Sequence, residues 1–147
     1  MIDQSLRPMR VLLVEDNPAD AELTRMALEA ANKRIKLEHV WDGGEALAFL
    51  RDTDQREPDL ILLDLNLPVM NGHETLDAIK NDPALKHIPV VIMTTSRAVK
   101  DVRSAYTNHA ACYINKPLDF DEFRHTVKAL GDFWFQVVVL PERDHRA

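Results

Sequence analysis

The sequence of 147 residues lacks the features that mark several classes of protein. It contains one cysteine, Cys112, so no intramolecular disulfide can form and a reducing compartment is expected. It has no apolar run of the ~18 residues that a membrane span needs, and residues 1–10 lack the apolar stretch of a signal peptide. These absences predict a cytoplasmic protein with no membrane partner.

Basic residues are in the minority. The chain has 18 Lys and Arg against 24 Asp and Glu, a formal net charge of -6. An acidic chain without a basic stripe is a poor candidate for binding nucleic acid. With 46% hydrophobic and 29% charged residues, the composition is that of a globular protein, and the length fits one domain of ~150 residues.

Short apolar runs alternate with amphipathic stretches, a pattern typical of a parallel sheet covered by helices. The run 60–63 is apolar without alternation, as expected of a central strand buried on both faces. Such sequential units require right-handed crossovers and predict a doubly wound α/β fold with helices on both faces of a five-stranded sheet. Of the two common strand orders we expect the flavodoxin-like order 2-1-3-4-5. The expected strands are residues 10–14, 35–40, 60–63, 90–93 and 110–114.

Caps and helical spacing predict where the helices lie. Asn17 and Pro18 suit the N-cap and first position of the first helix. The apolar faces of three helices are predicted to consist of Leu23, Met26, Ala27 and Ala30, of Val99, Val102, Ala105 and Tyr106, and of Phe123, Val127, Leu130 and Trp134.

Polar side chains stand at the ends of four of the five expected strands. Glu15 and Asp16 follow the first strand and Asp64 follows the third, while Thr94 and Lys116 stand at the ends of the fourth and fifth. Parallel strands direct such residues to one edge of the sheet, where these folds bind ligands. Three carboxylates gathered there repel one another unless a cation is present. Mg²⁺ prefers carboxylate, carbonyl and water oxygens, so the sequence predicts a magnesium site.

The same side chains suit phosphoryl transfer, in which catalysis is mostly alignment and charge stabilisation. Lys116 and Thr94 would each contact one phosphoryl oxygen, and the metal a third. Asp64 is the candidate nucleophile because it stands alone at the end of the central strand. Glu15 and Asp16 form an adjacent pair that would hold the metal.

These residues give the chain a resemblance to the receiver domain of two-component response regulators, over residues 11–130. The resemblance implies that Asp64 accepts a phosphoryl group from a histidine kinase. It also implies that Asp16 ligates Mg²⁺ directly, that Glu15 acts through water and that Asn66 supplies its backbone carbonyl. The motifs that carry the resemblance are Val14–Asn17, Asp59–Asp64 with Pro68 and Gly72, Val91–Thr94 and Tyr113–Pro117.

The resemblance also implies a conformational switch. Thr94 and Tyr113 would be the switch pair, with the hydroxyl moving toward the phosphate and the ring turning inward. The peptide bond between Lys116 and Pro117 is expected to be cis. The sequence departs from the family at Thr95, where a small Ala or Gly is common, and this side chain is expected to crowd phosphate access.

We expect an N-terminal extension over residues 1–9, a receiver domain over 10–131 and a C-terminal extension over 132–147. In the tail three aromatic residues are consecutive at 133–135, so no helix can bury all of them against one core, and 137–140 is predicted to be an extended apolar strand. Exposed apolar surface of this density marks an interface. A symmetric homodimer through the tail and the fourth and fifth strand–helix units is expected, with folding of the tail onto its own domain as the alternative.

The expected function is that of a single-domain response regulator that catalyses its own phosphorylation and dephosphorylation and is not a turnover enzyme. The 66–68 loop and the tail resemble the small regulators that partner bacterial phytochrome kinases, so such a kinase is the expected partner. One alternative is an aspartate-nucleophile phosphohydrolase, but Asn66 stands where such enzymes need a second acid. The other is a receiver-like scaffold that takes no phosphate, against which the acidic pair and Lys116 argue.

Overall fold

The computed structural model describes residues 8–141, so parts of both predicted extensions, 1–7 and 142–147, lie outside the described residues. The strands are β1 (Met9–Val14), β2 (Ile35–Val40), β3 (Leu60–Leu63), β4 (Val90–Thr94) and β5 (Cys112–Asn115). The helices are α1 (Pro18–Ala31), α2 (Gly43–Arg51), α3 (Gly72–Lys80), α4 (Val99–Thr107) and α5 (Phe120–Asp132). The strands pair in parallel in the order β2-β1-β3-β4-β5, which confirms the predicted fold class.

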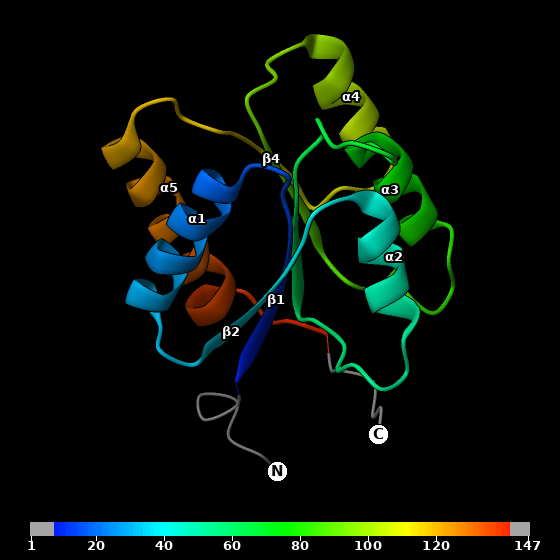
Figure 1. The fold of residues 1–147 in the computed structure, drawn as a ribbon, viewed down its shortest axis with the longest axis horizontal. Helices are drawn as coiled ribbons and strands as arrows, with labels where there is room; N and C mark the ends of the chain where they lie inside the picture. Colours follow the sequence, from blue (N-terminus) through cyan, green and yellow to red (C-terminus); the bar gives the residue numbers. More distant parts are fainter. Residues whose placement is uncertain (1–7, 142–147) are drawn as a thin grey trace.

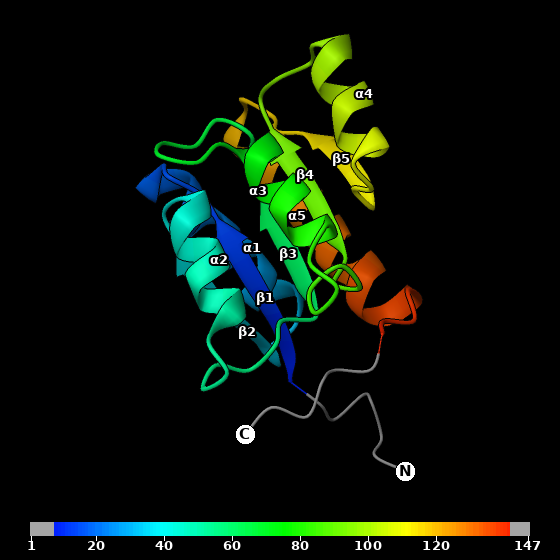
Figure 2. The same ribbon diagram turned by 90° about the vertical axis from the view of Figure 1, so that its right-hand side faces the viewer.

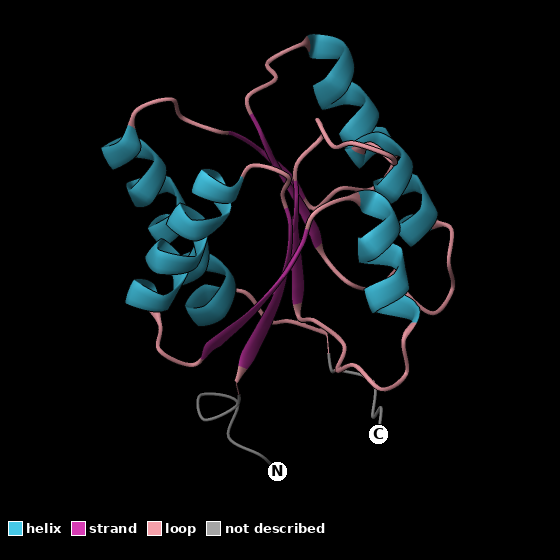
Figure 3. Ribbon diagram, in the orientation of Figure 1, coloured by secondary structure: helices cyan, strands magenta, loops and turns pink. Residues whose placement is uncertain are grey.

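The sheet lies between two layers of helices. Figure 1 shows α1 and α5 on one face and α2, α3 and α4 on the other, and Figure 2 gives the view at 90°. The secondary-structure colouring in Figure 3 shows the same three layers. Successive side chains of a strand point to opposite faces. In β1, Leu12 and Val14 therefore pack under α2 and α3, while Val11 and Leu13 pack under α1 and α5.

The cap of α1 confirms the prediction, but its buried face is different. The Asn17 side chain accepts hydrogen bonds from the backbone N–H groups of Ala19 and Asp20. The buried residues of the helix are Ala21, Thr24, Ala27 and Leu28, whereas Met26 is 58% exposed and Ala30 is also exposed. The predicted face was right at Ala27 and half-buried Leu23 and wrong at Met26 and Ala30, because α1 also packs against α5, where Leu28 lies close to the backbone of Gly131.

The predicted apolar face of α4 is right for two of its four residues. Ala105 is buried and Val102 half-buried, but Val99 is 73% and Tyr106 49% exposed. Helical spacing fixes which residues share a face, and the tertiary contacts decide whether that face is covered. Here α4 contacts β5 and the neighbouring α3 along a narrow strip, so two apolar side chains remain in solvent.

The tail continues α5 as a single π-helical turn over Phe133–Val137, so the predicted strand at 137–140 was wrong. Trp134 and Leu140 are buried in the core beside α1 and α5. The described part of the tail therefore packs on its own domain, as in the alternative to the expected homodimer. The large apolar side chains it leaves in solvent are Phe133, Val137 and Val139, at 53%, 69% and 88% exposure.

Within residues 8–141 no helix combines the length and apolar character needed to cross a bilayer.

Candidate functional site

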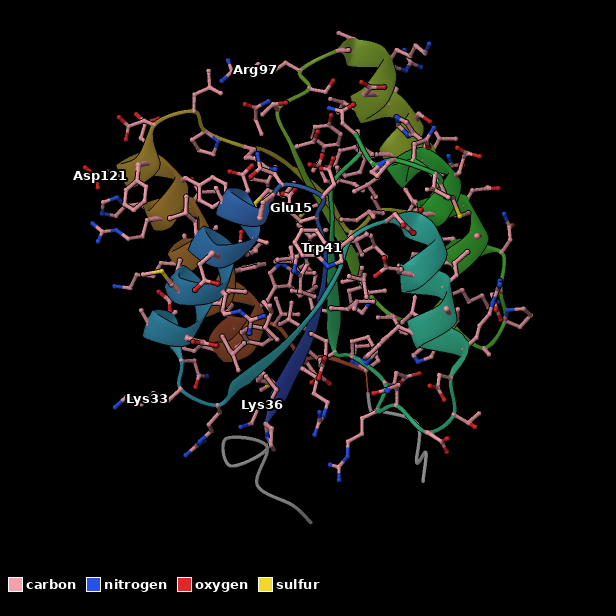
Figure 4. The ribbon with its side chains drawn as sticks, viewed as in Figure 1. Glu15, Lys33, Lys36, Trp41, Arg97 and Asp121 are labelled. Carbon is pink, nitrogen blue, oxygen red and sulfur yellow. The ribbon has the colours of Figure 1, made fainter. Side chains whose placement is uncertain are left out.

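The site lies at the end of the sheet where β1, β3 and β5 terminate, near the labelled Glu15 in Figure 4. Backbone hydrogen bonds hold the strand ends in register. The Asp64 N–H donates to the Val14 carbonyl at 3.2 Å, and the Lys116 N–H donates to the Thr94 carbonyl at 2.6 Å. Because the strands are parallel, the residues that follow them meet at one edge.

The Lys116 ammonium is the centre of this cluster. It donates to Glu15 Oε1 at 2.6 Å and to Asp64 Oδ2 at 3.2 Å. It also donates to Asp20 Oδ2 at 3.0 Å. An ammonium group has three donors, so these three carboxylates use all of them. Lys116, Glu15 and Asp64 are buried, and the Asp20 side chain is 27% exposed.

Glu15, Asp16 and Asp64 each offer a carboxylate oxygen, and these oxygens lie within 4.8 Å of one another. Asp16 is exposed, so the cluster opens to solvent on its side. Such a set of hard oxygen donors fits Mg²⁺, which takes carboxylates and retains several waters.

The charges of the site are not balanced. Burial raises the pKa of Glu15 to about 7, against the opposing hydrogen bond and charge of Lys116. Burial by itself lowers the pKa of Lys116, but its bonds to Glu15 and Asp20 and the charge of Asp64 raise it overall. The lysine is therefore cationic, and four nearby carboxylates face one ammonium. The excess of acid is the electrostatic condition in which a divalent cation binds favourably.

Main-chain groups fix the two buried carboxylates. The Asn66 N–H donates to Asp64 Oδ1 at 3.2 Å, and the Asn17 N–H donates to Glu15 Oε2 at 3.3 Å. A His39 ring nitrogen lies 2.8 Å from the Glu15 carbonyl and so supports this loop from β2. The role of His39 was not predicted, because histidines scattered along a sequence give no spacing signal.

A second network surrounds the predicted switch pair. Thr94 is fully buried at the end of β4, whereas Tyr113 is half-buried and donates its hydroxyl to the Ser96 carbonyl at 2.9 Å. The Ser96 hydroxyl donates to Asp101 Oδ2 at 2.6 Å. This bond, followed by the contact with His73, lowers the pKa of Asp101. The loop between β4 and α4 is thus tied to β5 and to α4.

The structure brings Glu15, Asp16, Asp64 and Lys116 together as predicted, and it adds Asp20. This residue is the third of α1, and its carboxylate reaches Lys116. The sequence did contain a signal for Asp20, because side chains of a helix lean toward the N-terminus of that helix. The N-terminus of α1 follows the acidic pair Glu15 and Asp16, so an acid in its first turn is directed toward the site. Asp20 was missed because acids are common in the first turn of any helix.

One expectation from the family resemblance was wrong. No peptide bond among residues 8–141 is cis, so the bond between Lys116 and Pro117 is trans. Trans is the lower-energy isomer of such a bond. With it, the Lys116 ammonium still reaches Glu15 at 2.6 Å.

A doubly wound sheet with three acids and a lysine at its carboxyl edge defines a small α/β protein of the two-component signalling class. The chain belongs to the response regulator receiver domain family, whose model matches residues 11–128. It is accordingly a response regulator of a two-component system.

Individual relatives match over nearly the whole chain. The response regulator Rcp1 of Synechocystis sp. is 41% identical over 145 residues, which span 96% of this chain and 99% of that protein. The solved Mn²⁺-bound form of Rcp1 superposes with a TM-score of 0.88 at 40% identity, covering 92% of this chain and 100% of the other. The phosphorylated cyanobacterial phytochrome response regulator RcpA gives 0.88 at 41% identity, covering 91% and 99%.

Proposed function

We propose that this response regulator accepts a phosphoryl group on Asp64 from a sensor histidine kinase and signals by a change of conformation. The observation that carries the proposal is the contact of Lys116 with both Glu15 and Asp64, at 2.6 and 3.2 Å, beside the exposed Asp16. The proposed nucleophile, Asp64, therefore lies within hydrogen-bond distance of the Lys116 ammonium and close to the proposed metal ligands Glu15 and Asp16.

Asp64 is the nucleophile because it is the central carboxylate and its Oδ1 is held by the Asn66 N–H. As one of its oxygens bonds to phosphorus, the bond from phosphorus to the donor histidine nitrogen breaks and its electron pair goes to the imidazole. Lys116 then moves a donor from a carboxylate to a phosphoryl oxygen. In the slower return reaction a water oxygen bonds to phosphorus and the Asp64 carboxylate leaves. The chain catalyses both steps on itself.

The metal ligands would be Glu15, Asp16, Asp64 and the backbone carbonyl of Asn66. We take the metal to be Mg²⁺, because the donors are all oxygen. When bound, Mg²⁺ supplies charge stabilisation at a phosphoryl oxygen. The solved form of Rcp1 is bound to Mn²⁺, and both ions accept this donor type.

The switch would run from Thr94 to the loop before α4. The added phosphoryl charge attracts the Thr94 hydroxyl, and the Tyr113 ring turns inward as its bond to Ser96 is lost. A phosphoryl group adds nearly two negative charges and three strong acceptors, so it has the differential contacts that a population shift needs.

The proposed partner is a phytochrome-type histidine kinase. The support is the near full-length match to RcpA, a cyanobacterial phytochrome response regulator, together with the 66–68 loop. Such a kinase presents its phosphohistidine in the cytoplasm, so the chain would act there.

We also propose a homodimer through α4, β5, α5 and the tail. The support is the exposed apolar side chains that α4, α5 and the tail carry, including Val99 and Val137 at 73% and 69%. Val137→Asp should convert a dimer to a monomer in analytical ultracentrifugation, while Met26→Asp on α1 should not. A wild-type chain that sediments as a monomer contradicts this part of the proposal.

Incubation with acetyl phosphate and Mg²⁺ tests the central claim. We expect a base-labile adduct of one phosphoryl group, absent in Asp64→Asn and retained in the surface variant Asp77→Asn. Sustained release of phosphate at enzymatic rates favours the phosphohydrolase instead. No adduct in the wild-type chain favours the scaffold. Label transfer from a phytochrome kinase then tests the partner.

A further inference from the structure

Asp20 is an acid that the proposed phosphoryl transfer does not use. Its carboxylate is bonded to Lys116 at 3.0 Å. It lies 96 residues from Lys116 in the sequence, so only the tertiary fold, which brings the first turn of α1 to the residue after β5, joins the two. Its own backbone is fixed, because the Asp20 N–H donates to the Asn17 cap and the Asp20 carbonyl accepts from the Thr24 hydroxyl.

The three carboxylates around Lys116 are not equivalent. Glu15 and Asp64 belong both to the lysine contacts and to the acidic cluster with Asp16. Asp20 stands outside that cluster and contacts the lysine. A cation held by the cluster therefore competes with Lys116 for Glu15 and Asp64. Asp20 remains available to Lys116 alone.

We propose that Asp20 is the positioning residue of Lys116, retaining the ammonium at the site while Glu15 and Asp64 serve a divalent cation and the phosphoryl group. The inference rests on the proposed function and deepens it by adding a residue that acts through another. Without Asp20, Lys116 bonds more fully to the metal ligands and competes with the cation. Once the cation is bound, the lysine has no anion left to hold it in place.

This arrangement predicts the direction in which Asp20→Asn changes two quantities, the Mg²⁺ affinity and the rate of phosphorylation. Asp20→Asn removes an anion near the cluster and strengthens the competition from Lys116, and both effects weaken Mg²⁺ binding. At saturating Mg²⁺ the phosphorylation rate also falls, because the donor of Lys116 is less well placed. If Asp20 were only a repelling charge near the incoming phosphate, the rate would rise instead.

The experiment compares the full chain with Asp20→Asn, Asp20→Glu and a matched control, Asp121→Asn. Asp121 is also a first-turn helix acid, and Figure 4 shows it at the periphery, away from Glu15. We measure Mg²⁺ affinity by calorimetry and the rate of phosphorylation by acetyl phosphate. Asp20→Asn should lower each about fivefold, which corresponds to ~1 kcal/mol for a partly exposed ion pair. Asp20→Glu should recover part of each loss, and Asp121→Asn should change neither.

The same Asp20→Asn change in a Lys116→Met background separates positioning from bulk charge. If Asp20 acts through the lysine, its effect on Mg²⁺ affinity falls below about twofold there. An unchanged Mg²⁺ affinity in Asp20→Asn, a faster phosphorylation, or an equal effect without Lys116 overturns the inference. A wild-type chain that takes no phosphate refutes the proposed function, and the Mg²⁺ titrations still decide the role of Asp20.

Discussion

Gly72 begins α3 at a point where the helix lies against the backbone of Asp64 and Leu65. A Cβ atom at position 72 would lie 2.2 Å from the Asp64 carbonyl oxygen and 2.5 Å from the Leu65 Cα. Ordinary contacts of this kind are ~3.5 Å, so the overlap is about 1 Å. Both opposing atoms are main chain at the end of a fully buried strand and cannot rotate away. Overpacking typically costs ~1–3 kcal/mol, and we expect about 3 kcal/mol for Gly72→Ala.

Gly131→Ala is the matched control, since it makes the same chemical change in α5. There the new Cβ would meet the Leu28 Cδ2 at 3.2 Å and the Ala31 Cβ at 3.5 Å, which are side-chain atoms. Alanine also favours a helix interior by ~1 kcal/mol over glycine. We expect this variant to lie between unchanged stability and a gain of about 1 kcal/mol.

Urea unfolding measures both variants. With a slope of ~1–3 kcal/mol per molar, Gly72→Ala should lower the midpoint by about 1–3 M at constant slope. The Asp64 carboxylate is displaced with its backbone, so the rate of phosphorylation by acetyl phosphate should fall as well. A loss below about 1 kcal/mol, or equal losses in the two variants, would refute the close approach of α3 to Asp64.

Three further predictions concern the site and its loops. Glu15 must lose its proton to ligate a metal, and burial raises its pKa to about 7. The Mg²⁺ affinity of the wild-type chain should therefore rise about tenfold between pH 6 and pH 8, whereas that of Glu15→Gln should not change with pH over this range. A wild-type affinity that does not change with pH contradicts this prediction. Ser96→Ala removes the 2.6 Å hydrogen bond to Asp101, which is the largest cause of the lowered pKa of that carboxyl group. An NMR titration should therefore show a higher pKa for Asp101 in the variant. An unchanged pKa would contradict the hydrogen bond between Ser96 and Asp101. Val69 has φ 64°, which strains a β-branched residue, and Val69→Gly should stabilise the chain by about 1 kcal/mol in urea unfolding. A destabilised Val69→Gly would mean that the turn is not strained.

The order of strands and helices and the main members of the site follow from the sequence. Apolar runs such as 60–63 identify buried strands, and sequential parallel strands direct the residues at their ends to one edge. The sequence alone therefore predicts that Glu15, Asp64 and Lys116 lie together. Their placement depends on topology alone, which a pattern along the chain can specify.

The remaining features depend on how elements pack across long separations in sequence. Helical spacing could not show that Val99 is in solvent or that Leu28 is buried against α5, because periodicity defines a face but not its neighbour. The contact of Asp20 with Lys116 likewise required α1 to lie beside the end of β5. The order of residues was enough to specify the fold and two of the three carboxylates around the lysine ammonium. The third carboxylate, that of Asp20, was decided only by the tertiary structure, because the packing angle of a helix depends on the elements it packs against and not on its own residues alone.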